Sequence, residues 1–217
     1  MLPRALRLRG VLLDWDGTLL DSYRADAHAY LEMFRVLGIA WGLKELKKCY
    51  SPNWYNVYRA ARIPRSRWDE ADRLWRRYYR YDDARLFPGA RGVLSTLGRK
   101  YALGLVTSGS RERVRKQLRK LGVGGCFAAR VFSEDATRRK PHPALLGLAL
   151  LRMRLAADEC VYIGDAPEDI EMARRAGVAS VGVLGTSPVP ARLRATRPDA
   201  TIDSVADLPR LLSALNQ

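Results

Sequence analysis

The sequence contains few cysteines and few histidines. Of its 217 residues, three are cysteine and two are histidine. Cys49, Cys126 and Cys160 are widely separated and form no CxxC pair, so the sequence predicts neither a disulfide framework nor a zinc site. We interpret them as reduced thiols of a cytoplasmic protein. Because two histidines cannot form a histidine-rich metal site, any bound metal should be a hard cation held by carboxylates.

Long apolar runs are also missing. No stretch approaches the roughly 18 to 20 consecutive apolar residues that a membrane helix needs. The apolar run 11–13 is followed at once by Asp14 and Asp16, so we expect no signal peptide and no membrane partner. With 47% apolar and 28% charged residues, the composition is that of a globular protein. It predicts one domain with an appendage.

Acidic residues are outnumbered by basic ones. Asp and Glu total 23 against 38 Lys and Arg, which gives a formal net charge of +15. A positive field attracts nucleic-acid backbones, but the basic residues are scattered along helical stretches such as 111–120, which we interpret as a solvated helix. We therefore do not expect nucleic acid to be the main partner. The same field would favour capture of a small phosphorylated metabolite, and the protein is expected to be a monomer or a homodimer.

Short apolar runs alternate with helical stretches of about ten residues along most of the chain. Such runs are typical of parallel strands that are buried on both faces of a sheet. The pattern predicts an α/β fold with a doubly wound, mostly parallel, Rossmann-like sheet. The predicted strands are residues 8–14, 101–107, 129–132, 160–163 and 180–183.

The alternation stops between residues 21 and 86, where the chain is predicted to be entirely helical. The insertion holds four of the five tryptophans and eight of the ten tyrosines. We predict that residues 1–20 and 87–217 form the α/β core and that residues 21–86 form a helical cap subdomain. The predicted cap helices are 22–38, 43–60 with a break at Ser51 and Pro52, and 67–82.

The first motif is Asp14-Trp15-Asp16-Gly17-Thr18, at the end of the first predicted strand. In an extended segment Asp14 and Asp16 point the same way, and Gly17 allows a sharp turn just beyond them. Two neighbouring carboxylates suit a divalent cation, or a nucleophile paired with an acid/base group. The same pattern also occurs in ordinary loops.

Two further motifs could bind an anion. Residues 106–110 (VTSGS) end a strand and begin a helix, so their hydroxyls and free N–H groups could cradle a phosphate, or Ser108 and Ser110 could merely cap the helix. Lys140 precedes the sequence Pro-His-Pro and could present a fixed positive charge, although a basic turn is usually solvated surface. We interpret His142 as structural.

The fourth motif, residues 164–169 (GDAPED), follows the strand 160–163. Asp165 lies at the strand end and Asp169 about one helical turn later, so both could approach one metal ion. Acidic residues in this position can also be simple helix caps. All four motifs fall at the carboxyl ends of predicted parallel strands or in adjacent loops, where open α/β sheets place their sites.

In this order, DWDGT, VTSGS, KPHP and GDAPED resemble the four motifs of the haloacid dehalogenase-like hydrolase superfamily. The resemblance spans essentially the whole chain, and the helical insertion resembles the cap found between the first and second motifs. Within the superfamily the sequence looks most like the phosphoglycolate phosphatase group. The resemblance implies a phosphatase that acts on a small phosphorylated metabolite.

The resemblance also implies roles for individual residues. Asp14 would attack phosphorus and become an aspartyl-phosphate, while Asp16 would protonate the leaving oxygen and later deprotonate the attacking water. Thr107 would bind the phosphoryl group together with the loop residues Ser108 and Gly109. Lys140 would neutralise charge on Asp14 and on the phosphate.

The implied cofactor is Mg²⁺. By the resemblance it would be held by the Asp14 carboxylate, the main-chain carbonyl of Asp16 and Asp165, with Asp169 as an additional or more distant ligand. Trp15 stands where phenylalanine is common in the family, and Ala166 stands where many relatives have serine. The cap segment 51–55 differs from the loop expected in a true phosphoglycolate phosphatase, which leaves the substrate open.

Several alternatives remain at this point. Asp16 argues against a dehalogenase, which lacks this second aspartate. A phosphonatase would need a cap lysine such as Lys44, Lys47 or Lys48, and we interpret all three as surface residues. A sugar phosphomutase of the same fold and a noncatalytic, basic binding protein remain open.

Cap side chains could line a substrate pocket or simply pack the cap. For the tryptophans we favour packing, because a small helical unit needs several large rings to hold it together. The candidates for a pocket wall are Trp54, Tyr55, Tyr58, Arg59 and Arg62.

Overall fold

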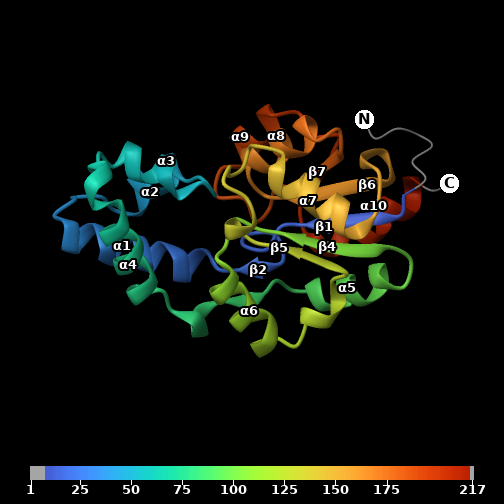
Figure 1. Ribbon diagram of the computed structural model, residues 1–217, viewed down its shortest axis with the longest axis horizontal. Coiled ribbons are helices and arrows are strands. Elements are labelled where there is room, and N and C mark those ends of the chain that lie inside the picture. The colour runs from blue at the N-terminus through green and yellow to red at the C-terminus, as the bar shows by residue number, and fades with distance from the viewer. Residues whose placement is uncertain (1–7, 216–217) are drawn as a thin grey trace.

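The computed structural model describes residues 8–215, and of the last of these only the backbone. Residues 1–7 and 216–217, which belong to the predicted core, lie outside the described part. The architecture is a six-stranded parallel sheet in the order β5-β4-β1-β6-β7-β8, with a separate group of helices beside it (Figure 1). The predicted fold class is confirmed. The strands are β1 (Gly10–Leu13), β4 (Ala102–Val106), β5 (Ala129–Val131), β6 (Cys160–Gly164), β7 (Ala179–Val183) and β8 (Ala200–Ile202).

The central strands are buried on both faces because nearly every side chain in them is apolar. In β1, Val11 and Leu13 point into one hydrophobic cluster, whereas Leu12 points into the other. This is the two-residue alternation of a strand between two layers of helices. Strand β8 was not predicted, because its three residues Ala-Thr-Ile bury only the last side chain at the sheet edge.

Helices cover both faces of the sheet. The first cluster is closed by α5 (Ala90–Gly98), α6 (Arg111–Lys120) and α10 (Leu208–Leu215), which contribute apolar side chains to it. The second is closed by α7 (Ala144–Met153) and α8 (Pro167–Arg175). The remaining core helix is α9 (Pro190–Ala195), which packs on α8.

Short 3-10 helices occupy the connections. They are Arg65–Arg67, Tyr81–Asp83, Gly124–Cys126, Ser133–Asp135, Ala157–Glu159 and Val205–Asp207. Within residues 8–215, none of the helices has the length and apolar character needed to cross a membrane.

Four helices form the group beside the sheet: α1 (Tyr23–Leu37), α2 (Leu43–Cys49), α3 (Trp54–Ala60) and α4 (Trp68–Tyr78). They pack around their own hydrophobic cluster, which includes Met33, Phe34, Leu46 and Tyr58. The single predicted helix 43–60 is two helices, separated at the expected break.

A two-stranded antiparallel ribbon joins these helices to the core. Strand β2 (Leu20–Asp21) pairs with β3 (Arg85–Leu86), so the chain leaves and re-enters the core at one place. The ribbon lies at both ends of the predicted insertion 21–86. The exact division into core and cap subdomain stays a prediction.

Candidate active site

The candidate site lies at the carboxyl edge of the three central strands. Asp14 follows β1, Thr107 follows β4 and Asp165 follows β6, and β1 pairs with both β4 and β6. Parallel strands deliver the residues after them to one edge, so side chains more than ninety residues apart in sequence meet there. The motif order in the sequence thus becomes a single cluster in space.

Lys140 is the centre of this cluster. Its side chain is fully buried, and Nζ donates hydrogen bonds to Asp14 Oδ1 at 2.7 Å, Asp169 Oδ1 at 2.8 Å and the Tyr162 hydroxyl at 2.8 Å. Burial acts to lower the pKa of Lys140, but the Asp14 and Asp169 carboxylates outweigh it and raise this pKa. A buried charge needs such partners, so Lys140 stays an ammonium group.

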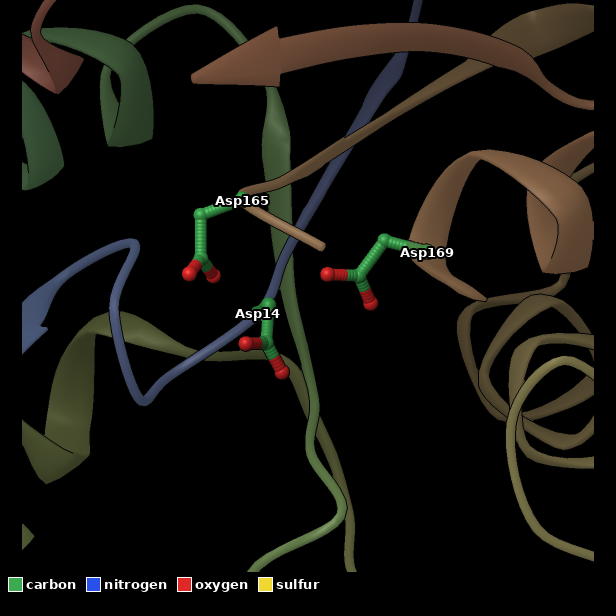
Figure 2. A group of neighbouring side chains, drawn as sticks. All are labelled: Asp14, Asp165 and Asp169. Atoms are coloured by element: carbon green, nitrogen blue, oxygen red, sulfur yellow. The ribbon is translucent and has the colours of Figure 1, made fainter. Parts of the chain in front are cut away.

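Three carboxylates surround one shared space. Oxygens of Asp14, Asp165 and Asp169 lie within 4.8 Å of one another, and all three side chains are buried (Figure 2). Burial raises the pKa of Asp14 to about 7, against the lowering effect of Lys140. Burial, followed by the Asp14 and Asp169 charges, also raises the pKa of Asp165.

This donor set fits a hard divalent cation. Lys140 neutralises only one of the three negative charges; burial raises the pKa values of Asp14 and Asp165, and the neighbouring carboxylates add to the rise. Carboxylate oxygens are the ligands that Mg²⁺ prefers. Asp169 is the most engaged of the three, because it accepts hydrogen bonds from Lys140 and from the Ala166 N–H at 3.1 Å.

Asp16 does not join the three carboxylates. Its side chain forms a two-point ion pair with Arg113: Arg113 Nη1 lies 2.8 Å from Asp16 Oδ1, and Arg113 Nη2 lies 2.6 Å from Asp16 Oδ2. Burial acts to raise the pKa of Asp16, but the Arg113 charge and hydrogen bonds lower it overall. Gly17, directly after Asp16, has φ +79°, and a Cβ there would collide with the Asp165 carboxylate.

The loop after β4 has the form of an anion cradle. Thr107 is buried, and its hydroxyl accepts a hydrogen bond from the Gly109 N–H at 2.9 Å. The Ser108 hydroxyl is buried and has no partner within residues 8–215. Ser110 makes no side-chain capping bond; the Arg111 N–H instead donates to the Glu134 carboxylate at 3.0 Å. Simple capping by the serines therefore does not explain this loop.

A cavity of about 320 Å³ opens above these groups. Among the cap candidates, Trp54, Tyr55 and Tyr58 line it. Arg59 and Arg62 do not line it: the Arg59 guanidinium bonds to Asn56 and lies over Trp68.

Two of the cap tryptophans do more than pack the cap, which is the role we predicted for them. Trp54 and Trp75 line the cavity as well as packing against the cap cluster. Lys44, Lys47 and Lys48 are exposed and do not line the cavity. His142 accepts the Ala144 N–H at 3.2 Å at the start of α7, which fits its structural interpretation.

The sequence analysis missed Arg113. We interpreted it as part of a solvated helix, and that was wrong: its side chain is only 8% exposed. The guanidinium lies 5.8 Å from the ring centre of Trp75 and 5.2 Å from that of Tyr79, both in the inserted segment 21–86, and of the two only Trp75 lines the cavity. The buried face of α6, with Val114, Gln117 and Leu118, follows the helical period and could have indicated it.

The sheet, the carboxylates at its edge and the inserted helices define a doubly wound α/β protein with an acidic site at the carboxyl edge of its sheet. A family model described as haloacid dehalogenase-like hydrolase matches residues 11–183. The chain belongs to the haloacid dehalogenase-like hydrolase family, as the four motifs predicted.

Curated relatives agree with this assignment. The chain is 27% identical to the pyrophosphatase PpaX of Bacillus velezensis, covering 93% of this chain and 95% of that protein. It is 28% identical to the phosphoglycolate phosphatase of Yersinia pseudotuberculosis, covering 93% and 91%. The predicted class of enzyme, a phosphatase of this family, is confirmed.

Solved structures share the fold. A haloacid dehalogenase-like hydrolase from Streptococcus pneumoniae superposes with a TM-score of 0.84 at 22% identity, covering 96% of this chain and all of that one. At this identity the likeness concerns the fold alone.

Proposed function

We propose that the protein is a Mg²⁺-dependent phosphomonoester hydrolase that acts on a small phosphorylated metabolite through an aspartyl-phosphate intermediate. The observation that carries the proposal is the position of Asp14: a buried carboxylate at a strand end, held at one oxygen by Lys140 and facing a cavity. The two relatives named above, a phosphoglycolate phosphatase and a pyrophosphatase, support phosphate chemistry.

In the first step an Asp14 oxygen attacks phosphorus, forming the aspartyl-phosphate bond as the bond from phosphorus to the leaving oxygen breaks. Lys140 and the loop residues Thr107, Ser108 and Gly109 offer donors to the phosphoryl oxygens, where negative charge develops. Asp16 supplies a proton to the leaving oxygen. In the second step Asp16 takes a proton from the water that attacks phosphorus, the bond from phosphorus to the Asp14 oxygen breaks, and phosphate and the free Asp14 carboxylate are released.

The ion pair with Arg113 bears on the second step. Because Arg113 lowers the pKa of Asp16, it favours the ionised carboxylate, the form that accepts a proton. Donation to the leaving group requires this pair to loosen.

The metal would be held by Asp14 and Asp165 carboxylate oxygens and the Asp16 main-chain carbonyl, with Asp169 beside them. When bound, Mg²⁺ supplies positive charge that stabilises the transferring phosphoryl group. We propose the core and cap division at residues 1–20, 21–86 and 87–217 as part of this function, with the cap over the cavity. The cytoplasmic location stays a prediction.

The test is phosphate release from p-nitrophenyl phosphate and a panel of phosphometabolites that includes phosphoglycolate and sugar phosphates. We expect release with Mg²⁺, none after chelation, and a loss of at least about 10³-fold in Asp14→Asn. Asp158→Asn, an exposed aspartate near β6, is the matched control and should keep full activity.

Folding of each variant is checked by circular dichroism. A folded wild-type protein that releases no phosphate would contradict the proposal in favour of a binding role. An isomeric sugar phosphate as product would indicate a mutase.

A further inference from the structure

The cavity above Asp14 has aromatic walls. Most of them belong to the cap helices α1, α3 and α4, so the inserted segment and not the sheet forms the end remote from Asp14. The aromatic side chains that line it are Tyr30, Tyr50, Trp54, Tyr55, Tyr58 and Trp75.

The size of the cavity exceeds what a two-carbon leaving group fills. Its volume of about 320 Å³ lies at the lower end of the range of about 300 to 1,000 Å³ in which proteins enclose drug-sized ligands. Flat aromatic walls gain most from a flat ring, because stacking needs a second planar surface. The remote end therefore fits a leaving group that carries a planar ring.

The wall also has hydrogen-bond donors without partners. Trp54 Nε1 and Arg139 NH1 are buried and have no acceptor within residues 8–215. Arg139 is held in place: its guanidinium lies 3.7 Å from the Trp54 ring centre, and NH2 donates to the Tyr55 hydroxyl at 3.4 Å. Both atoms have essentially no exposed area, so they lie within the wall and not on the cavity surface, and the cavity meets the rings beside them.

Acceptors face the same cavity. The carboxylates of Asp26, from α1, and Asp72, from α4, both line it. Asp72 Oδ1 accepts the Tyr58 hydroxyl at 2.7 Å, which leaves most of its acceptor capacity unused. Carboxylate oxygens there can accept hydrogen bonds from N–H or O–H groups of a substrate.

Arg76 and Arg113 also line the cavity. Neither turns the end of the cavity that is remote from Asp14 into a simple binding site for an anion. Arg113 is occupied by Asp16, and Arg76 is exposed on α4. Aromatic rings beside carboxylate acceptors suit a planar ring that carries N–H groups, and nucleobases, which proteins recognise by stacking and by hydrogen bonds, are such rings.

We propose that the substrate is a nucleoside monophosphate, with the base enclosed by the cap wall around Trp54 and Asp72. This inference rests on the proposed phosphatase function and names its substrate class. In the reaction the nucleoside oxygen leaves from phosphorus and takes up the proton from Asp16, so that a nucleoside and inorganic phosphate are the products.

The decisive comparison is between 5′-nucleoside monophosphates and ribose 5-phosphate, which carries the same phosphate and sugar without the base. We expect kcat/KM to be at least about tenfold higher for the best nucleotide, which corresponds to about 1.4 kcal/mol and is within the range measured for stacking one base. Equal or faster hydrolysis of ribose 5-phosphate would overturn the inference. So would phosphoglycolate as the best substrate.

Variants locate the selectivity. Trp54→Leu should reduce the nucleotide to ribose 5-phosphate ratio by about tenfold. Trp41→Leu removes a cap tryptophan that does not line the cavity, and it should leave the ratio unchanged. Equal changes of the ratio in both variants would mean that cap packing, and not base contact, sets selectivity, and would overturn the inference.

The two proposals fail in different ways. Hydrolysis of p-nitrophenyl phosphate without preference for nucleotides contradicts this inference and leaves the proposed function intact. Absence of hydrolysis of every compound contradicts the proposed function. In that case binding of the nucleotide and of ribose 5-phosphate to Asp14→Asn, measured by calorimetry, still decides whether the cap wall recognises a base.

Discussion

At the scale of single residues, the ion pair of Asp16 with Arg113 has the largest consequence that the sequence analysis did not foresee. The two side chains are 97 positions apart, and the pair is mostly buried. Breaking a buried pair by removing one partner leaves an uncompensated charge, which costs far more than losing a surface contact.

We expect Arg113→Met to lower the free energy of unfolding by about 3 kcal/mol, because Asp16 would lose its partner in a buried setting. Arg119→Met makes the same chemical change at an exposed position of the same helix and should change stability by less than about 0.5 kcal/mol. Urea unfolding of both variants measures the difference. Similar stability of the two would show that the pair has little energetic weight.

A second residue-scale prediction concerns pH. Burial acts to raise the pKa of Asp135. Hydrogen bonds from Arg152, the Phe132 N–H and Arg111 outweigh this effect and lower the pKa from 3.8 to about 2. Because the folded-state value is below the unfolded one, the stabilisation is complete above about pH 4 and is lost as pH falls toward 2.

We expect Asp135→Asn to cost about 1 kcal/mol at pH 6, since the two arginines are partly solvated and their attraction is screened. The cost should shrink as unfolding is measured at successively lower pH between 4 and 2. A cost that stays constant over this range would contradict the assigned pKa.

At the scale of elements, the cap helices have a hydrophobic cluster of their own. Phe34 on α1 is fully buried in it, whereas Val36 on the same helix is 43% exposed. The cap contacts the core through the β2–β3 ribbon, a 2.5 Å hydrogen bond from Ser51 to Glu168, and the side chains of Arg113 and Arg139, which lie over cap aromatic rings.

We expect Phe34→Ala to destabilise the protein by about 3 to 4 kcal/mol, through lost burial and the cavity left behind. Val36→Ala should cost less than about 0.5 kcal/mol. Hydrogen exchange should show the loss of protection concentrated in α1–α4. Equal loss in the sheet strands β1, β4 and β6 would contradict an independently packed cap.

At the scale of the whole molecule, the chain carries a formal net charge of +15, and the proposed substrate is an anion. A positive field raises the local concentration of phosphate esters, and salt screens it: the Debye length falls from about 30 Å at 0.01 M to about 10 Å at 0.1 M.

We expect kcat/KM to fall severalfold over this salt range while kcat at saturation stays nearly constant, because the field acts on capture and not on the bound phosphate. Steady-state kinetics in sodium chloride measures this, with sucrose as an uncharged control for solution viscosity. A kcat/KM that does not change with salt would mean that the charge has no part in substrate capture.

The sequence alone determined the family, the parallel sheet and the identity of the clustered residues Asp14, Thr107, Lys140 and Asp165. The four motifs identified the family by resemblance, and the resemblance also supplied Lys140. The apolar runs supplied the sheet and the common edge of Asp14, Thr107 and Asp165, because a buried parallel strand must be apolar on both faces and its carboxyl end delivers the next residues to that edge. Strand β8 was not predicted because a strand of three residues at the sheet edge buries too few side chains to show an apolar pattern.

Only the tertiary structure decided what surrounds those residues. How α6 packs against the cap helices decides three features: the ion pair of Asp16 with Arg113, the burial of that arginine and the cavity wall. Local periodicity does not encode this packing. A charged helix looks the same in sequence whether one arginine faces water or a carboxylate. The physical reason is that the partner of a side chain is set by packing between distant segments, whereas the burial of a strand is indicated by the apolar pattern of its own residues.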